Sequence, residues 1–589
     1  MKKIFVCLPY LLLFVIHTEA QFYFKGEVTD SKNNPLPYTR IHVYSTNLFY
    51  SSGSIGVFGI PSSKQSDSVS FFLNGYKEKR VLLTSSDYNS IILEPTAITT
   101  VQKGTLLSVI KNIEKGAPNK SDHYGETYIE QKENTFVETT LYPTTGFSMN
   151  IDKASYSNIR RFINRESPVP VNAVRIEEML NYFPQKLKEP LPGKTFFIES
   201  QLTDCPWYSY HRLLYLRLHA RKINTEKLPP SNLVFLIDVS GSMDLPNRLP
   251  LLKTAFRMLV QNLREVDTIS IMVYGGAVGI VLQPTSGKEK EKIIATVDSL
   301  SAAGDTPGES ALRQAYTLAQ RKFKKEGNNR IILATDGDFN VGEVSEEAMI
   351  QLITQKQQTG IYLTCLGVGM GNYKDSKLEV LAKKGNGNFA YLDNIMEAEK
   401  VLVKEFTQTL YAVANDAYLN VTFNPEYVQW YRLIGYDNRN DQLHDTINSV
   451  EGGEIGTGHT VTAVFEIELT KPDVSKGQIL ASAELNFKEP ETSKQEKELF
   501  PLQNNYIPFI KADSSYRFSS AVVYFGLLLK KSSYLMGAGW DQLITLLPSA
   551  VNTNDYWQKE MATLILKAKE IYKPVRKKNT FFKKKKKDE

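Results

Sequence analysis

Cysteine is scarce in this chain, and the motifs of several common enzyme classes are missing. The 589 residues include Cys7, Cys205 and Cys365, and no Cys-x-x-Cys pair, so neither a zinc cluster nor a dithiol redox site is predicted. Gly-x-x-x-x-Gly-Lys-Ser/Thr, Gly-x-Ser-x-Gly and His-Glu-x-x-His are also lacking, which excludes P-loop nucleotide binding, nucleophile-elbow hydrolases and zincin peptidases. The chain is therefore not predicted to be an enzyme.

Long apolar runs are lacking after the N-terminus. Two lysines precede an apolar stretch from Ile4 to Ile16, and Thr18 and Ala20 place small residues at positions −3 and −1 before Gln21. This order predicts a signal peptide over residues 1–20, cleaved between Ala20 and Gln21, with an uncleaved anchor as the alternative. No later run reaches the roughly 18 apolar residues of a membrane helix. We expect an exported protein of the periplasm, cell envelope or outer surface of a Gram-negative-type bacterium.

A basic binding face is lacking as well, although the formal net charge is +6. The tail over residues 573–589 holds nine lysines or arginines and two acids, so this tail accounts for all of the excess positive charge. A solvated tail is predicted, with a weak contact to an anionic membrane surface as the alternative. Nucleic acid is not expected as a partner.

One buried strand ends in side chains that suit a metal ion. The apolar run 233–237 is followed by Asp238-Val239-Ser240-Gly241-Ser242. A continuous apolar run bounded by turn residues is typical of a buried parallel strand, and ligands gather at the carboxyl ends of such strands. One carboxylate and two hydroxyls are hard oxygen donors, which Mg²⁺ prefers.

Two later segments offer more oxygen donors. Thr306 lies in a loop before a helical stretch, and Asp336 follows a second apolar run, 331–334. In the absence of a metal, Ser240 and Ser242 would cap the next helix and Asp336 would open a turn. Their order along the chain favours a shared metal site instead.

These residues resemble the metal-ion-dependent adhesion site of the von Willebrand factor type A domain. The resemblance implies that Ser240, Ser242 and Thr306 bind Mg²⁺ through hydroxyls, and Asp238 and Asp336 directly or through water. Mn²⁺ would be accepted in its place, and an acidic residue of a protein partner would fill the last position. We expect the site, including Asp238, to lie on a solvent-facing rim, with glycines 241, 275, 304 and 337 shaping the backbone around it.

The same resemblance predicts a multidomain chain. A doubly wound α/β domain is expected over residues 230–410, ending in a helix from Met396 to Leu410. An N-terminal β-sandwich over 21–94 resembles the carboxypeptidase regulatory-like domain, and residues 95–140 have the composition of a linker.

Strand-rich segments are expected on both sides of the α/β domain, over 141–229 and 411–572, the latter becoming helical towards its end. Asp152–Phe162, Arg432–Arg439 and Gly453–His459 are similar to the YfbK-like group of bacterial proteins. The two segments are predicted to pair into one β-rich body that carries the α/β domain as an insertion. Two independent flanking domains are the alternative.

These expectations lead to one functional hypothesis and two alternatives. The hypothesis is an exported bacterial protein that binds a protein partner through a Mg²⁺-dependent adhesion site. The alternatives are a hydrolase that uses the metal to activate water and an envelope scaffold whose metal is purely structural. Cys205 and Cys365 are expected as two buried thiols, although an oxidising compartment also permits a bridge.

Overall fold

The computed structural model describes residues 22–95, 105–107 and 126–573, except for positions 38, 47, 54–55, 63, 74–75, 150, 184, 186, 225–227, 276–277, 305–307, 338–345, 371–372, 437–451 and 491. The chain divides into two units, Met1–Gln102 and Lys103–Glu589, and each is described by itself. Among the described residues, none of the helices combines the length and the apolarity needed to cross a bilayer.

The first unit is built from two small β-sheets, as expected for residues 21–94. Their strand orders are β4-β1-β7 and β3-β2-β5-β6. Phe24, Ile41 and Phe71 are fully buried in the core that the two sheets share. The strands are β1 (Phe22–Asp30), β2 (Arg40–Val43), β3 (Leu48–Ser51), β4 (Val57–Ser62), β5 (Ser66–Phe72), β6 (Lys79–Thr84) and β7 (Tyr88–Leu93). The likeness to a carboxypeptidase regulatory-like domain stays a prediction.

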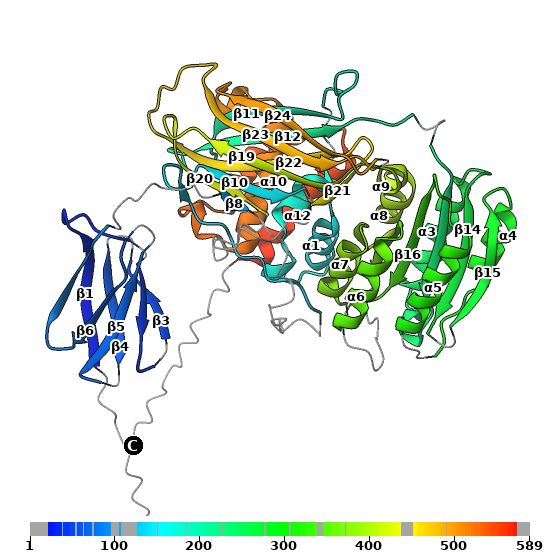
Figure 1. Cartoon of the computed structure of the whole chain (residues 1–589), viewed down its shortest axis with the longest axis horizontal. Helices are drawn as coiled ribbons and strands as arrows, with labels where there is room; N and C mark the ends of the chain where they lie inside the picture. Colours follow the sequence, from blue (N-terminus) through cyan, green and yellow to red (C-terminus); the bar gives the residue numbers. More distant parts are fainter. Residues whose placement is uncertain are drawn as a thin grey trace, which may run out of the picture. The chain divides into compact units, whose positions relative to one another are not determined.

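The α/β domain of the second unit, green in Figure 1, has a sheet of order β15-β14-β13-β16-β17-β18. Neighbouring strands are parallel except for β15, which runs antiparallel to β14. Chain order reverses between β13 and β16, and such a reversal is where doubly wound sheets bind ligands. The strands are β13 (Ser231–Asp238), β14 (Thr268–Tyr274), β15 (Gly279–Ser286), β16 (Asn328–Thr335), β17 (Ile361–Val368) and β18 (Phe389–Leu392).

Helices cover both faces of this sheet, which explains the apolar run in β13. Leu233, Phe235 and Ile237 join the core beneath α3, α4 and α8, whereas Val234 and Leu236 join the core beneath α5, α6 and α7. The helices are α3 (Leu249–Gln261), α4 (Lys290–Ser299), α5 (Gly308–Arg321), α6 (Glu346–Gln357), α7 (Asp375–Lys384), α8 (Ile395–Glu399), the π-helical η5 (Lys400–Lys404) and α9 (Phe406–Leu410), with a short 3₁₀ turn η4 (Gly241–Asp244).

Two further sheets pack face to face into a β-body, and each combines strands from both sides of the α/β domain. One has the order β24-β23-β19-β10-β8 with β21 beside β19, and the other β11-β12-β22-β20-β9. The strands are β8 (Thr105–Leu107), β9 (Val137–Glu138), β10 (Thr144–Ser148), β11 (Phe196–Asp204), β12 (Arg212–Ala220), β19 (Ala412–Phe423), β20 (Val428–Ile434), β21 (Gly453–Gly456), β22 (Thr460–Leu469), β23 (Ile479–Lys488) and β24 (Gln495–Gln503). Because β10 pairs with β19 and β12 with β22, the prediction of one body with an inserted domain is confirmed.

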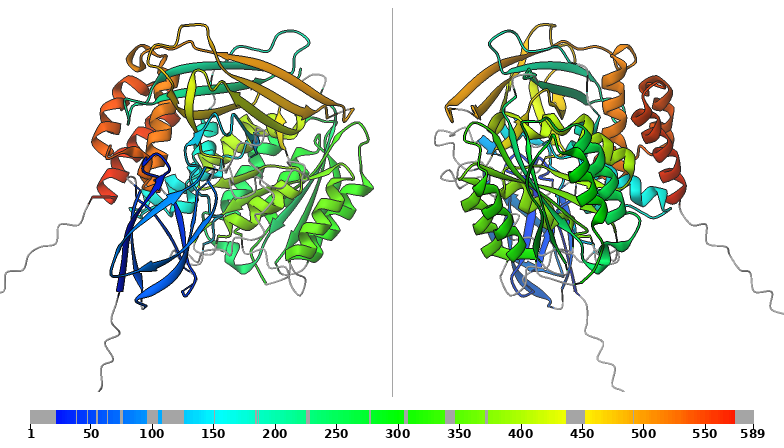
Figure 2. Two further views of the ribbon diagram at one scale, coloured as in Figure 1. Left: turned by 60° about the vertical axis from the view of Figure 1, so that its left-hand side comes forward. Right: turned by 90° about the vertical axis from the view of Figure 1, so that its right-hand side faces the viewer.

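Helices cover the outer face of the second sheet. In β12, Leu214 and Leu216 point into the core between the sheets, whereas Leu213 and Tyr215 pack against the helices. Figure 2 shows the C-terminal helices, orange to red, side by side on this flank. The elements are α1 (Ala154–Asn164), η2 (Val171–Ala173), α2 (Ile176–Tyr182), η7 (Phe509–Lys511), α10 (Ser514–Lys530), η8 (Ser533–Leu535), α11 (Trp540–Ala550) and α12 (Tyr556–Ile571).

Buried ion pairs join the inserted domain to the β-body, and we call this contact the seam. Arg160 of α1 donates to Asp393 and, at 2.6 Å, to Glu397, both in the inserted domain. Arg175 contacts Asp375 at the start of α7 at 2.8 Å. All of these side chains are at most 8% exposed. The inserted domain is therefore fixed to the body by charge as well as by its chain connections.

Two sequence expectations are wrong in detail. Residues 126–140 are not linker, because Glu126 forms a buried ion pair with Arg161 at 2.7 Å and β9 pairs with β20. Composition cannot separate a polar segment that is paired in a protein from one that is solvated. The final helix 396–410 is interrupted, because five residues form the π-helical η5 before α9 begins.

Helix α7 has no counterpart among the predicted elements. Its polar sequence suggests a solvated segment, but Asp375 and Glu379 are buried at the seam, and Lys383 pairs with Glu379. The expectation of two buried thiols is confirmed, since Cys205 and Cys365 are both free and buried.

Candidate metal centre at the sheet edge

Asp238 ends β13 at the point where the chain order of the sheet reverses. Its Oδ1 accepts the N–H of Ser240 at 2.9 Å, and its Oδ2 accepts the hydroxyls of Tyr274 at 3.1 Å and Thr335 at 2.9 Å. The side chain is thus held in one orientation by three donors. Because Asp238 is only 1% exposed, the expectation that it lies on a solvent-facing rim is wrong.

Burial also disfavours the ionised form of the Asp238 carboxyl. Removal from water raises the pKa of Asp238, and the hydrogen bonds from Ser240 and Thr335 offset part of that rise. A nearby cation would favour the ionised form. The group therefore benefits from a positive charge close by.

Three further oxygens converge beside Asp238. The Oγ atoms of Ser240 and Ser242 are 3.1 Å apart, and Ser242 Oγ donates to Asp336 Oδ2 at 2.7 Å. Two neighbouring ligands of an octahedral Mg²⁺ at 2.0–2.1 Å would be about 3.0 Å apart. Ser242 is exposed whereas Asp336 is buried, so the group of oxygens reaches the protein surface at Ser242.

The loop that precedes α5 lies against this site through its backbone. Gly241 N donates to Gly304 O at 3.0 Å, and Ala303 N donates to Val239 O at 2.6 Å. Thr306 itself lies outside the described residues. Its role as a ligand stays a prediction that the position of Gly304 supports.

Close backbone packing around the site accounts for two of the predicted glycines. A Cβ at Gly275 would be 2.3 Å from the backbone nitrogen of Ser240. Gly337 has φ +90°, and a Cβ there would be 2.4 Å from the backbone nitrogen of Lys374. A larger residue at either position would displace a loop that carries a candidate ligand.

Arg248, just before α3, was not predicted from the sequence. Its Nη1 donates to Asp336 Oδ2 and to Ser242 O, both at 2.6 Å, and its Nη2 donates to Met370 O at 2.9 Å. The side chain is 8% exposed. The sequence offered no signal beyond a basic residue at a helix start, where the dipole disfavours positive charge.

A second group of acids, at the seam, contrasts with this arrangement. Ligand atoms of Asp152, Glu178 and Glu379 lie within 4.8 Å of one another, and all three residues are buried. Arg175 contacts Glu178 at 2.5 Å, and Lys383 pairs with Glu379. Because protein cations already contact two of these three acids and all three are buried, we assign no ligand to the cluster.

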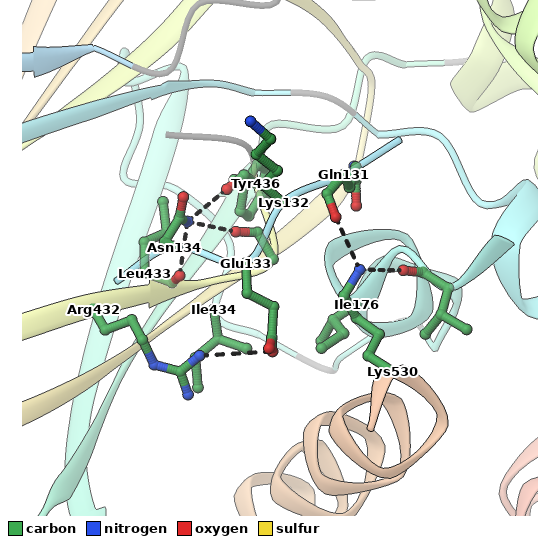
Figure 3. A pocket seen from close by; sticks show the side chains of 12 residues that line it. Gln131, Lys132, Glu133, Asn134, Ile176, Arg432, Leu433, Ile434, Tyr436 and Lys530 are labelled. Carbon is green, nitrogen blue, oxygen red and sulfur yellow. Dashed lines mark hydrogen bonds and ion pairs between the residues drawn. The ribbon is translucent and has the colours of Figure 1, made fainter. Parts of the chain in front are cut away.

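A pocket between β20, α2 and α10, drawn in Figure 3, is likewise lined by residues that bond one another. Asn134 Nδ2 donates to the carbonyls of Leu433, Gly435 and Tyr436 at 2.7–3.0 Å. Lys530 Nζ reaches the carbonyls of Gln131 and Val174 at 3.4 Å. These bonds fasten residues 131–134 to the body.

The structure thus brings together Asp238, Ser240, Ser242 and Asp336 from the predicted set. Thr306, the cleavage residues Ala20 and Gln21, and the basic tail from position 574 lie outside the described residues. The four clustered side chains offer hard oxygen atoms only, which fits Mg²⁺ or Mn²⁺.

Comparison with known families divides the chain as the fold does. Residues 232–409 match the family described as von Willebrand factor type A domain. Residues 408–571 match the family described as "Uncharacterized protein YfbK, C-terminal", and residues 122–215 match one described as von Willebrand factor. The first match coincides with the α/β domain, and the other two cover much of the β-body and its helices.

Individual proteins resemble different lengths of the chain. YfbK of Escherichia coli (strain K12) is 37% identical over 441 residues, which are 71% of this chain and 76% of YfbK. Inter-alpha-trypsin inhibitor heavy chain H4 of Homo sapiens is 30% identical over 203 residues, or 33% of this chain and 21% of that protein. Among solved structures, a von Willebrand factor type A protein from Catenulispora acidiphila covers 65% of this chain and 91% of its own, at 12% identity and a TM-score of 0.39.

Proposed function

Because the chain belongs to the YfbK family, with a von Willebrand factor type A domain at its centre, we propose that it is an exported bacterial protein that binds a protein partner through Mg²⁺. A domain of this type indicates protein–protein interaction. One observation supports the metal above all: Ser240 Oγ, Ser242 Oγ and Asp336 Oδ2 have neighbour distances of 3.1 and 2.7 Å, close to the ligand spacing of Mg²⁺.

The ion would be held by Ser240, Ser242, Asp336 and Thr306, with Asp238 reaching it directly or through water. When bound, it supplies a Lewis-acidic position that attracts an anionic oxygen. The exposed side of Ser242 is where a partner would approach. An Asp or Glu of that partner is the ligand we propose for the remaining position.

Two observations speak against the alternative functions. Between residues 220 and 443 the sequence has no histidine, so the hydrolase alternative lacks the commonest general base in the metal-binding domain. For the scaffold alternative, backbone bonds from Gly241 and Ala303 and the contacts of Arg248 already tie the loops together. A metal is not needed for that task.

Partner capture from an envelope extract tests the proposal. Thr306→Ala should weaken capture without altering the unfolding transition, and chelation of the wild type should reproduce the loss. Mg²⁺ or Mn²⁺ should restore capture to the chelated protein. Thr317→Ala is the matched control, because Thr317 is exposed on α5 and its hydroxyl donates to Arg313 O of the same helix.

Either of two results would contradict the proposal. Capture that survives both Thr306→Ala and chelation would make the metal structural, and metal-dependent turnover of a substrate would favour the hydrolase. Export is tested separately, by mass spectrometry of the purified protein, where Gln21 is the expected first residue. Recovery of an intact Met1 chain from membranes would favour the anchor.

A further inference from the structure

We propose that Arg248 is a built-in cation of the candidate metal centre, which lowers its affinity for the ion and makes the loaded site select a carboxylate. This inference rests on the proposed function, because it needs an ion at the site. It assigns a role to a residue that lies beside the candidate ligands without being one of them.

Arg248 and the ion would share one carboxylate. Asp336 Oδ2 accepts both Ser242 Oγ at 2.7 Å and Arg248 Nη1 at 2.6 Å. An ion that binds Ser242 Oγ and Asp336 would therefore lie close to the guanidinium. Arginine stays protonated at all ordinary pH values, so the two cations repel each other. Screening by water is weak here, because the Arg248 side chain is only 8% exposed.

The same charge would favour an acidic ligand. Asp238 and Asp336 together balance a divalent cation, and Arg248 then leaves one positive charge uncompensated among these contacting groups. A carboxylate brought by the partner neutralises that charge, whereas a neutral oxygen ligand does not. Arg248 thus weakens binding of the ion and strengthens binding of an acid to the loaded site.

A purely structural role for Arg248 predicts the opposite outcome. The guanidinium also bonds Ser242 O and Met370 O, and a Cβ at Gly369, which has φ +75°, would be 2.4 Å from Arg248 Nε. If positioning of these loops were its main role, then removal of the side chain would loosen the ligands and weaken ion binding. If charge dominates, removal tightens ion binding.

Calorimetric titration with Mg²⁺ and with Mn²⁺ separates the two roles. Arg248→Gln should bind either ion about ten-fold more tightly than wild type, since removal of a like charge at this range is worth at least that factor. Arg248→Lys keeps the positive charge but loses the planar set of guanidinium donors. Its affinity for either ion should therefore stay within about three-fold of wild type. Arg257→Gln is the control, because Arg257 lies on the same helix α3 and pairs with Asp298 at the surface. Urea unfolding in EDTA confirms that each variant is folded.

Acetate then reports on the choice of ligand. Bound Mn²⁺ is paramagnetic, so it speeds the NMR relaxation of the methyl protons of any acetate that binds beside it. At equal Mn²⁺ saturation, this enhancement should be several-fold smaller for Arg248→Gln than for wild type or Arg257→Gln. If Arg248→Gln binds the ions equally well or more weakly while wild type binds them, the inference is wrong and the proposed function stands. If wild type binds neither ion, the proposed function itself fails.

Discussion

The candidate metal centre and the seam use the same residue types in different ways. At the metal centre, Asp238 and Asp336 lie beside two serine hydroxyls, and one of these is exposed. At the seam, carboxylates such as Glu397 and Asp375 are buried against arginines. Asp336 also pairs with Arg248, but the metal centre includes the exposed hydroxyl of Ser242, whereas these seam carboxylates and their arginines are all buried.

This difference shows why clustering of acids alone does not define a binding site. The ligand atoms of Asp152, Glu178 and Glu379 lie within 4.8 Å of one another, as in a carboxylate metal site. Two of these three acids, however, already contact Arg175 or Lys383. The metal centre has hydroxyl donors, an open side and a position at the reversal of strand order. The seam should therefore govern stability, and the metal centre should govern binding.

The largest effect on stability is expected at the seam. Arg160→Met leaves Asp393 and Glu397 buried without their cation and also removes the contact to Glu560 at 3.0 Å. Breaking a buried pair in this way typically costs about 3–5 kcal/mol. Urea unfolding measures it, with Arg257→Met as the exposed control, expected to cost about 0–1 kcal/mol. Equal costs for the two variants would show that the buried ion pairs of the seam stabilise the fold no more than an exposed pair does.

The second prediction concerns pH. Glu454 of β21 faces Arg330 of β16 at 3.6 Å, and burial raises the pKa of Glu454 to about 7. Since the folded state then holds the proton more tightly than the unfolded chain, this group favours folding at acidic pH. That contribution is lost as pH rises from about 4.5 through 7, by up to about 1.4 kcal/mol per pH unit.

Glu454→Gln tests this linkage, because glutamine cannot ionise. Compared with the wild type, the variant should gain stability steadily between pH 5 and pH 7, as measured by urea unfolding at each pH. Contributions from other groups cancel in this difference. Parallel pH profiles for the two proteins would show that Glu454 ionises normally in the folded state.

The third prediction links the two regions, because Asp238 is both buried and a candidate ligand. Asp238→Asn removes the charge but keeps the shape, so unfolding should become easier by only about 1–2 kcal/mol. Loss of the carboxylate should weaken Mg²⁺ binding by at least about 10–100-fold. Calorimetry and urea unfolding measure the two effects, and Asp244→Asn, at an exposed acid of the same loop, is the control. Unchanged Mg²⁺ affinity in Asp238→Asn would remove Asp238 from the site.

The sequence predicted the α/β domain well, because buried parallel strands leave an uninterrupted apolar signal such as 233–237. Asp238, Ser240, Ser242 and Asp336 were predicted as one cluster, since they follow two strands whose carboxyl ends meet at one edge. Arg248 was not predicted, because its contact with Asp336 spans 88 residues and no local pattern encodes it. The same holds for α7 and residues 126–140, whose polar side chains are matched by partners far away in the chain.

The smallest stability effect should come from Ser242→Ala. Ser242 is exposed, and its hydroxyl bonds Asp336 at 2.7 Å, which retains Arg248 as a second donor. The free energy of unfolding should therefore change by no more than about 0.5 kcal/mol. Ion binding should nevertheless fall by ten-fold or more by calorimetry, because a hydroxyl ligand is lost without replacement. Ser299→Ala, at an exposed hydroxyl near the end of α4 that bonds Thr296 O, should change neither quantity. If Ser242→Ala destabilised the fold by several kcal/mol, the metal centre would resemble the seam, and its exposed oxygens would be structural rather than available to a ligand.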